Sequence, residues 1–236
     1  MTLNMFRKLG LLFLAANTFA IAASAQIQFG LKAGLNIAEL NTSNSQYAAI
    51  AGGTPQSIKN YPRTLFNAGA LVDVPLNKKF ILQPELSFSM QGATGNPNQG
   101  YQVNATETYK YNFINLPVLI KYMLPMGIYA ETGPQLGYLI AAHIDEVGIG
   151  AMHKVTYNVK DQLKSTEISW ALGVGYQAPF NVGIDVRYNL GLTSYNNASA
   201  TGLATSPIQN GNLKNSVVQI GVYYLFGKTK EPAPEQ

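Results

Sequence analysis

The sequence contains no cysteine, which excludes both a disulfide framework and thiol chemistry. Charged residues are also scarce, at 12% of the chain against 47% hydrophobic residues. The formal net charge of +4 includes Arg7 and Lys8 in the N-terminal segment, so the rest of the chain is nearly neutral. A net charge this small does not favour a nucleic-acid partner, so we expect the protein not to bind nucleic acid.

Long apolar runs are absent beyond the N-terminal segment, which excludes transmembrane helices because a spanning helix needs about 20 mostly apolar residues. The one apolar run, residues 9–23, follows Arg7 and Lys8 and ends beside small residues. This pattern predicts a secretory signal peptide over residues 1–25, cleaved after Ala25. Because cysteine is absent, the mature N-terminus offers no site for lipoprotein acylation.

Apolar residues at every second position are the main feature of the remaining chain. In residues 80–91, Phe80 and Phe88 share one face with other apolar residues, whereas Gln83 and Glu85 lie on the other. A period of two residues is typical of β-strands. The same alternation predicts eight strands, at residues 27–36, 64–75, 80–91, 110–123, 127–140, 167–177, 180–192 and 215–226.

These strands predict an all-β protein, an eight-stranded antiparallel up-and-down transmembrane β-barrel over residues 26–226, with its apolar face toward lipid. Short turns alternate with long polar segments at 37–63, 92–109, 141–166 and 193–214. Outer-membrane barrels have short periplasmic turns and longer extracellular loops. We therefore expect localisation to the cell outer membrane, with residues 227–236 as a flexible periplasmic tail.

The inward phase carries the charges of the strand interiors. Because unpaired buried charge is costly, we expect these residues to pair across a packed lumen rather than to line an ion path. Three prolines within strands predict bulges or local breaks, since proline cannot donate to a β-ladder. The predicted lumen charge cluster is Lys32, Asp73, Glu85, Lys121, Glu131, Asp185 and Arg187.

Aromatic residues on the outward phase predict girdles at the two membrane interfaces. Because the strand is tilted, Phe80 and Phe88 are separated by roughly 20 Å along the barrel axis, close to the height of a membrane-spanning apolar band. The predicted girdle comprises Phe80, Phe88, Tyr122, Tyr138, Trp170, Tyr176, Tyr224 and Phe226.

The whole pattern resembles the outer-membrane β-barrel family of Bacteroidetes, of the porin-like or PorT-like group. The segments that carry the resemblance are GLKAGLNIAEL (30–40), LQPELSFSMQG (82–92), YNFINLPVLIKY (111–122), YAETGPQLGYLI (129–140), VRYNLGLTS (186–194) and IGVYYLF (220–226). The resemblance implies an outer-membrane barrel of a Gram-negative cell but little about its activity. A few relatives resemble parts of protein-secretion machinery, and no residue of this sequence singles out that role.

No residue cluster predicts catalysis or cofactor binding, so we expect a protein that is not an enzyme and has no cofactor or metal. His143, Asp145, Glu146 and His153 match no standard metal-ligand spacing, and both histidines are predicted in a loop. A lipid-modifying barrel enzyme using these histidines is the less favoured alternative.

The sequence favours a non-enzymatic envelope or adhesion scaffold that binds through extracellular loops. The alternatives are a narrow pore for small solutes and a PorT-like accessory of protein secretion. Expected partners are outer-membrane lipid, the barrel-assembly machinery during insertion and an extracellular ligand or protein at the loops. We expect a monomer.

Overall fold

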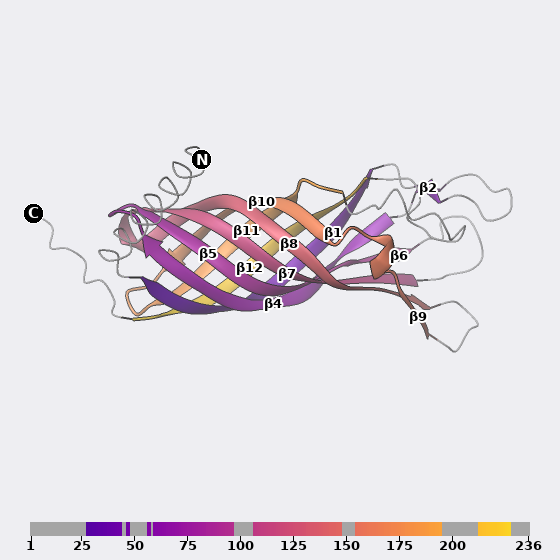
Figure 1. Cartoon of the computed structure of the whole chain (residues 1–236), viewed down its shortest axis with the longest axis horizontal. Coiled ribbons are helices and arrows are strands. Elements are labelled where there is room, and N and C mark those ends of the chain that lie inside the picture. Colours follow the sequence, from indigo (N-terminus) through magenta and orange to yellow (C-terminus); the bar gives the residue numbers. More distant parts are fainter. Residues whose placement is uncertain are drawn as a thin grey trace, which may run out of the picture.

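A computed structural model describes residues 27–43, 46–47, 56–57, 59–96, 106–147, 154–194 and 212–227. The predicted signal peptide and almost all of the predicted C-terminal tail lie outside these residues. Eight long strands dominate the described chain (Figure 1). They are β1 (Gln28–Ser43), β4 (Lys59–Pro75), β5 (Phe80–Gln91), β7 (Thr106–Met123), β8 (Ile128–Val147), β10 (Thr166–Gln177), β11 (Val182–Gly191) and β12 (Asn212–Phe226).

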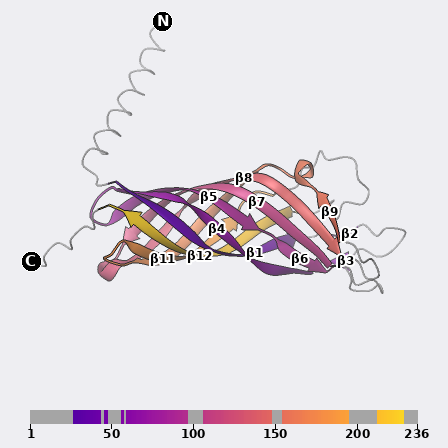
Figure 2. The same ribbon diagram turned by 90° about the horizontal axis from the view of Figure 1, so that it is seen from below.

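Each long strand pairs with its neighbour in the chain, and β1 closes the ring by pairing with β12 (Figure 2). Every pairing is antiparallel, and Phe29 of β1 lies opposite Phe226 of β12. The predicted eight-stranded antiparallel barrel is therefore confirmed. Among the described residues, no helix is long and apolar enough to cross a membrane.

The two ends of the barrel differ. At the short-turn end, β4 connects to β5, β7 to β8 and β10 to β11 within four residues each, the second through the 3-10 turn η1 (Pro125–Gly127). Met126 and Asn181 in these turns have positive φ angles of 65° and 66°. The opposite, long-loop end carries the short strands β2 (Gln46–Tyr47), β3 (Gln56–Ser57), β6 (Ala93–Asn96) and β9 (Lys154–Asn158), and the 3-10 turn η2 (Lys160–Gln162).

Several strands run farther toward the long-loop end than the alternation pattern predicted. β1 continues to Ser43, β7 begins at Thr106 and β8 reaches Val147, within segments that were predicted as loops. These parts of the loop prediction are wrong. In β7 the side chains of this extension also alternate, but with the polarity of the two faces exchanged, as described below.

The side chains of the barrel wall are sorted by face. On β11, Ile184, Val186 and Tyr188 are exposed, whereas Asp185 and Arg187 between them are buried. The outward face of the other strands is also apolar and exposed. A band of exposed apolar side chains around a polar interior is the reverse of a water-soluble sandwich, so the barrel is built to be surrounded by lipid.

The three in-strand prolines interrupt the ladder without shifting it. Pairing is broken beside Pro84 between β4 and β5, beside Pro117 between β5 and β7, and beside Pro134 between β7 and β8. The register is the same on both sides of each gap, so these are local breaks and not bulges. The β7–β8 ladder does shift register, but between Asn112 and Phe113.

Candidate functional site

Arg187 lies at the centre of the lumen and joins two carboxylates from different strands. Its Nη1 and Nη2 donate to the two oxygens of Glu85 at 3.1 and 2.8 Å, and its Nε donates to Glu131 Oε1 at 2.8 Å. Arg187 is only 1% exposed. A bidentate, buried guanidinium pair of this geometry fixes three strands, β5, β8 and β11, to one another across the lumen.

Lys32 extends the same network to β1. Its Nζ lies 2.7 Å from Asp185 Oδ2 and 3.9 Å from Glu85 Oε1. The side chain crosses over Gly221 of β12, where an added Cβ would lie 2.5 Å from Lys32 Cε. The glycine therefore makes room for the lysine to reach its acid partner.

Lys121 and Asp73 form a second pair toward the short-turn end. Their closest atoms, Lys121 Nζ and Asp73 Oδ2, are 3.6 Å apart, which is longer than a hydrogen bond. Lys121 Nζ also lies 4.6 Å from the ring centres of both Tyr129 and Tyr223. The ammonium group is thus held by one carboxylate charge and two aromatic faces.

The two tyrosines need glycines beside them. A Cβ at Gly183 would lie 2.1 Å from the Tyr223 ring, and a Cβ at Gly175 would lie 2.3 Å from the Tyr129 ring. Together with Leu71 and Leu225, these rings form a buried apolar layer across the barrel. The lumen is therefore filled at this level.

An uncharged network of amides and hydroxyls fills the lumen on the other side of the charges. Asn36 donates to Ser89 at 2.9 Å and accepts from Asn67 at 2.7 Å. Gln219 also donates to Asn36, at 3.3 Å, and Asn215 donates to Gln91. These contacts connect β1, β4, β5 and β12, four successive strands of the barrel, so polar side chains fill this side of the lumen.

All seven residues of the predicted lumen charge cluster are buried inside the barrel. The structure joins all seven by ion pairs into two groups. The first contains Arg187, Lys32, Glu85, Glu131 and Asp185, and the second contains Lys121 and Asp73. The amide network and the two lumen tyrosines were not identified from the sequence. The sequence does indicate that these residues point into the lumen, because they occupy the same inward phase as the charges.

The predicted girdle residues lie on the outer surface. Phe80 and Tyr122 are in ring contact at 5.1 Å, and Tyr224 and Phe226 at 5.2 Å. Both pairs lie at the short-turn end, and Tyr176 at the end of β10 lies there too. Phe88, Tyr138 and Trp170 lie farther along their strands, toward the long-loop end.

Trp170 has its polar atom satisfied within the apolar surface. Its Nε1 donates to Thr132 Oγ1 at 2.9 Å, and that hydroxyl donates to the Ala171 carbonyl at 3.0 Å. A chain of this kind removes the cost of an unpaired indole N–H in a non-polar medium.

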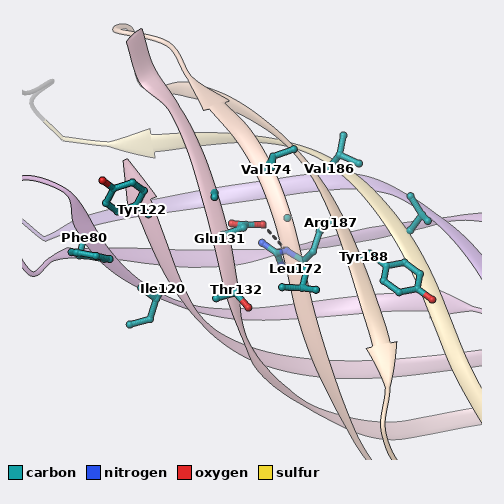
Figure 3. Close-up of a pocket in the computed structure, with 13 residues that line it drawn as sticks. Phe80, Ile120, Tyr122, Glu131, Thr132, Leu172, Val174, Val186, Arg187 and Tyr188 are labelled. Carbon is teal, nitrogen blue, oxygen red and sulfur yellow. Dashed lines mark hydrogen bonds and ion pairs between the residues drawn. The ribbon is translucent and has the colours of Figure 1, made fainter. Parts of the chain in front are cut away.

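A shallow apolar hollow lies on the same outer surface, over β7, β8, β10 and β11 (Figure 3). Ile120, Tyr122, Leu172, Val174 and Val186 surround it. The hollow forms at Ala130, which has only a methyl side chain and lies between its pairing partners Tyr122 and Val174. The Glu131–Arg187 ion pair, drawn as a dashed line in Figure 3, belongs to the lumen side of these strands.

Strand β7 shows where the apolar band ends. On its outward phase, Ile114 to Tyr122 are apolar, whereas the next outward residues toward the long-loop end are Asn112 and Lys110. On its inward phase the change is the opposite, from Lys121 and Asn115 to aromatic residues. The two phases therefore exchange polarity between Ile114 and Asn112, and beyond this point the strand resembles one from a water-soluble protein, with its apolar side inward.

An apolar core supports the wall beyond this boundary. Tyr109, Tyr111 and Phe113 of β7 pack with Leu139 and Ile144 of β8, and all are at most 5% exposed. Ala93, Ala142, Val159 and Leu163 complete the cluster. We call the sheet that this core supports the platform: residues 59–62 of β4, β6, residues 106–112 of β7, residues 141–147 of β8, and β9.

The outward face of the platform carries a charged cluster centred on Asp145. Lys110 Nζ lies 2.5 Å and Lys154 Nζ 2.9 Å from Asp145 Oδ2, and Thr156 donates to Asp145 Oδ1 at 2.8 Å. Hydrogen bonds from Lys110, Lys154 and Thr156 hold the pKa of Asp145 well below its ordinary value. The cluster ties β9 to β7 and β8.

The structure corrects the predicted location of His143. It lies in β8, opposite Lys110 of β7 and Asn158 of β9, and not in a loop, because β8 continues beyond the apolar band as part of the platform. His153 lies outside the described residues. Within the described part of the chain, no group of three or more His, Cys, Asp or Glu side chains is arranged to hold a metal.

A closed antiparallel barrel with an apolar outer band, a lumen that contains buried charged and polar side chains, and a platform at one end is a transmembrane β-barrel. Residues 16–197 match the family described as "Outer membrane protein beta-barrel domain", so the chain belongs to this family and the protein is located in the outer membrane. No curated protein sequence matches the chain significantly.

Solved outer-membrane barrels resemble this structure at low sequence identity. Neisserial surface protein A has a TM-score of 0.47 and 14% identity, over 84% of this chain and 97% of that chain. The attachment invasion locus protein Ail of Yersinia pestis has a TM-score of 0.43 and 12% identity, over 85% and 99%. OprG of Pseudomonas aeruginosa has a TM-score of 0.40 and 11% identity, over 84% and 95%. Similarity at this level does not extend to function.

Proposed function

We propose that the protein is a non-enzymatic binding protein of the cell surface, in which a sealed barrel anchors the platform outside the cell. The observation that carries this proposal is the exchange of polarity on β7 between Ile114 and Asn112. The chain builds a hydrophobic core for a wall that stands clear of the membrane. The long-loop end faces the exterior, as in outer-membrane barrels generally.

The filled lumen supports anchoring over transport. Three successive layers cross it: the aromatic layer around Tyr129 and Tyr223, the ion pairs of Arg187 and Lys32, and the amide network around Asn36. Ions or solutes would have to displace buried, paired charges to pass, which is costly.

The platform chemistry supports binding over catalysis. Asp145, the acid that shares this face with His143, is engaged by two lysines, and its lowered pKa makes it a poor proton acceptor near neutral pH. Lysine, tyrosine and valine side chains are exposed on β9 instead. These side chains suit recognition of a macromolecule.

The proposal includes three further partners or states. Outer-membrane lipid surrounds the apolar band, and an acyl chain fills the hollow over Ala130. The barrel-assembly machinery inserts the chain. We propose a monomer, and the closed ring supports this because its membrane strands leave no edge for pairing with a second copy.

The proposal is tested with a variant in which residues 146–157 are replaced by a short turn and the barrel is kept. Cells that display the variant are expected to lose binding to the surface or partner that wild-type cells bind. In planar bilayers, neither the wild-type protein nor the variant is expected to show stable conductance. Equal binding by both strains would contradict the proposal. Stable wild-type conductance would favour the narrow pore, and blocked export of other proteins in a deletion strain would favour a secretion accessory.

A further inference from the structure

The hollow on the outer surface runs obliquely up the barrel wall from the short-turn end (Figure 3). Five successive strands each contribute one outward residue to it, and these residues are paired in ladder register: Phe80, Tyr122, Ala130, Val174 and Val186. Phe80 is the first residue of β5, Ala130 the third of β8 and Val186 the fifth of β11. Because all three strands begin at the short-turn end, the row rises from that rim into the apolar band.

The hollow is bounded on its long-loop side by Trp170. This residue pairs with Pro134, which follows the hollow residue Thr132 along β8 toward the long-loop end. The Trp170 Nε1 donates to Thr132 Oγ1 at 2.9 Å, so the indole lies against the edge of the hollow. At the other end the hollow reaches the rim beside the Phe80 ring. The shape therefore favours an apolar chain that enters from the short-turn end.

Two exposed lysines lie at this end of the hollow. Lys78 and Lys79 directly precede Phe80, in the turn between β4 and β5. Lys79 O accepts from Met123 N at 2.7 Å, which holds the turn beside the end of β7. Among the described residues, the acids in this half of the barrel are at most 5% exposed and lie in the lumen: Asp73, Glu85, Glu131 and Asp185. The exposed charge at the entrance is therefore positive, and it would attract an anionic headgroup.

We propose that the hollow binds one anionic phospholipid of the leaflet at the short-turn end. One acyl chain lies along the hollow over Ala130, and the phosphate lies at Lys78 and Lys79. Apolar contacts hold the chain and the two ammonium groups hold the headgroup, so different residues recognise the two parts of the lipid. The inference rests on the proposed function, which places the short-turn end in the periplasm and an acyl chain in the hollow, and it names the lipid.

Trp170 can report on the lipid in the hollow, because it is the only tryptophan of the chain and lies at the edge of the hollow. Bromine atoms in the middle of an acyl chain quench tryptophan fluorescence on contact. The full-length protein is reconstituted into phosphatidylcholine vesicles that contain a minor fraction of brominated phosphatidylglycerol or, separately, of brominated phosphatidylcholine. The ratio of quenching by the two lipids measures the preference for the anionic lipid at this site.

In the wild type we expect phosphatidylglycerol to be preferred at least about fivefold. K78Q/K79Q should bring the ratio close to one, because the headgroup loses its cations. A130L should do the same, because the larger side chain fills the hollow. Heat-modifiability on gels shows that each barrel has folded.

Two matched controls should keep the wild-type ratio. A70L makes the same change at an exposed outward alanine of β4, which lies outside the hollow. K164Q/K214Q removes two exposed lysines of the long-loop end.

Equal quenching by the two lipids in the wild type would overturn the inference, and so would a preference that either K78Q/K79Q or A130L leaves unchanged. Crosslinked dimers that A130L abolishes would assign the hollow to a second copy of the chain instead. None of these outcomes decides the proposed function, because the replacement of residues 146–157 tests surface binding at the opposite end of the barrel.

Discussion

We expect removal of the Arg187 guanidinium to destabilise the barrel strongly. Arg187 is 1% exposed and makes three hydrogen bonds to Glu85 and Glu131, which are 5% and 3% exposed. In R187M a side chain of similar length remains, but two buried carboxylates lose their common partner. Breaking a buried pair in this way costs about 3–5 kcal/mol, a large share of a total stability of roughly 5–15 kcal/mol.

A triple variant tests whether charge is the cause. In R187M/E85Q/E131Q no unpaired charge remains in this group, while Lys32 keeps its 2.7 Å contact with Asp185. We expect the triple variant to regain most of the lost stability, because replacing a whole buried ionic group by neutral side chains is close to neutral. K214A at the exposed rim serves as the control and should change stability by less than about 0.5 kcal/mol.

The assay is reversible urea unfolding in lipid vesicles, followed by the fluorescence of Trp170, the only tryptophan of the chain. Its indole lies on the outer surface, 42% exposed, so its emission changes when the barrel leaves the membrane. A loss below about 1 kcal/mol in R187M, or a triple variant no more stable than R187M, would refute the account of the lumen as a network of obligatory charge pairs.

Three other tests address separate parts of the structure. G183A places a Cβ 2.1 Å from the Tyr223 ring, so unfolding experiments should show a loss of about 1–3 kcal/mol that Y223L relieves; no relief would contradict the close fit. I184K, in the apolar band, should cost about 2–4 kcal/mol, whereas V155K on the platform should cost little; equal costs would place both residues in the same medium. Folding lowers the pKa of Asp145, so its contacts should stabilise β9 above the unfolded pKa of about 3.9 and be lost only as the pH falls below it. Amide exchange of β9 measured from neutral to acidic pH should show this loss in the wild type and not in D145N.

The fold could be predicted because the membrane imposes one rule on every strand. Apolar and polar residues alternate in each of the eight strands, as in Ile184 to Tyr188, so each strand has one apolar face. A closed barrel is the arrangement that turns all eight apolar faces toward lipid. The lumen charges follow from the same phase. The phase of the alternation does not give the distances between lumen side chains. The pairing of Arg187 with two acids rather than one could therefore be seen only in the structure.

The platform was missed for a physical reason. In TETYKYNF, residues 106–113, the apolar residues Tyr109, Tyr111 and Phe113 alternate as in the barrel, but on the inward phase. A strand that is recognised by apolar residues on its outward phase ends where the bilayer ends. His143 was assigned to a loop for the same reason, since β8 shifts phase opposite Asn112 and Phe113.

The boundary on β7 can be measured directly because the chain has no cysteine of its own. Single cysteines at the even positions from Lys110 to Ile120 would each carry a spin label, in protein reconstituted into lipid vesicles. We predict that labels at 114, 116, 118 and 120 are accessible to lipid-soluble oxygen, that labels at 110 and 112 are accessible to a water-soluble nickel chelate, and that the change falls between 112 and 114. Nickel accessibility along the whole series, or no change between 112 and 114, would contradict a barrel whose two faces exchange polarity where the membrane ends.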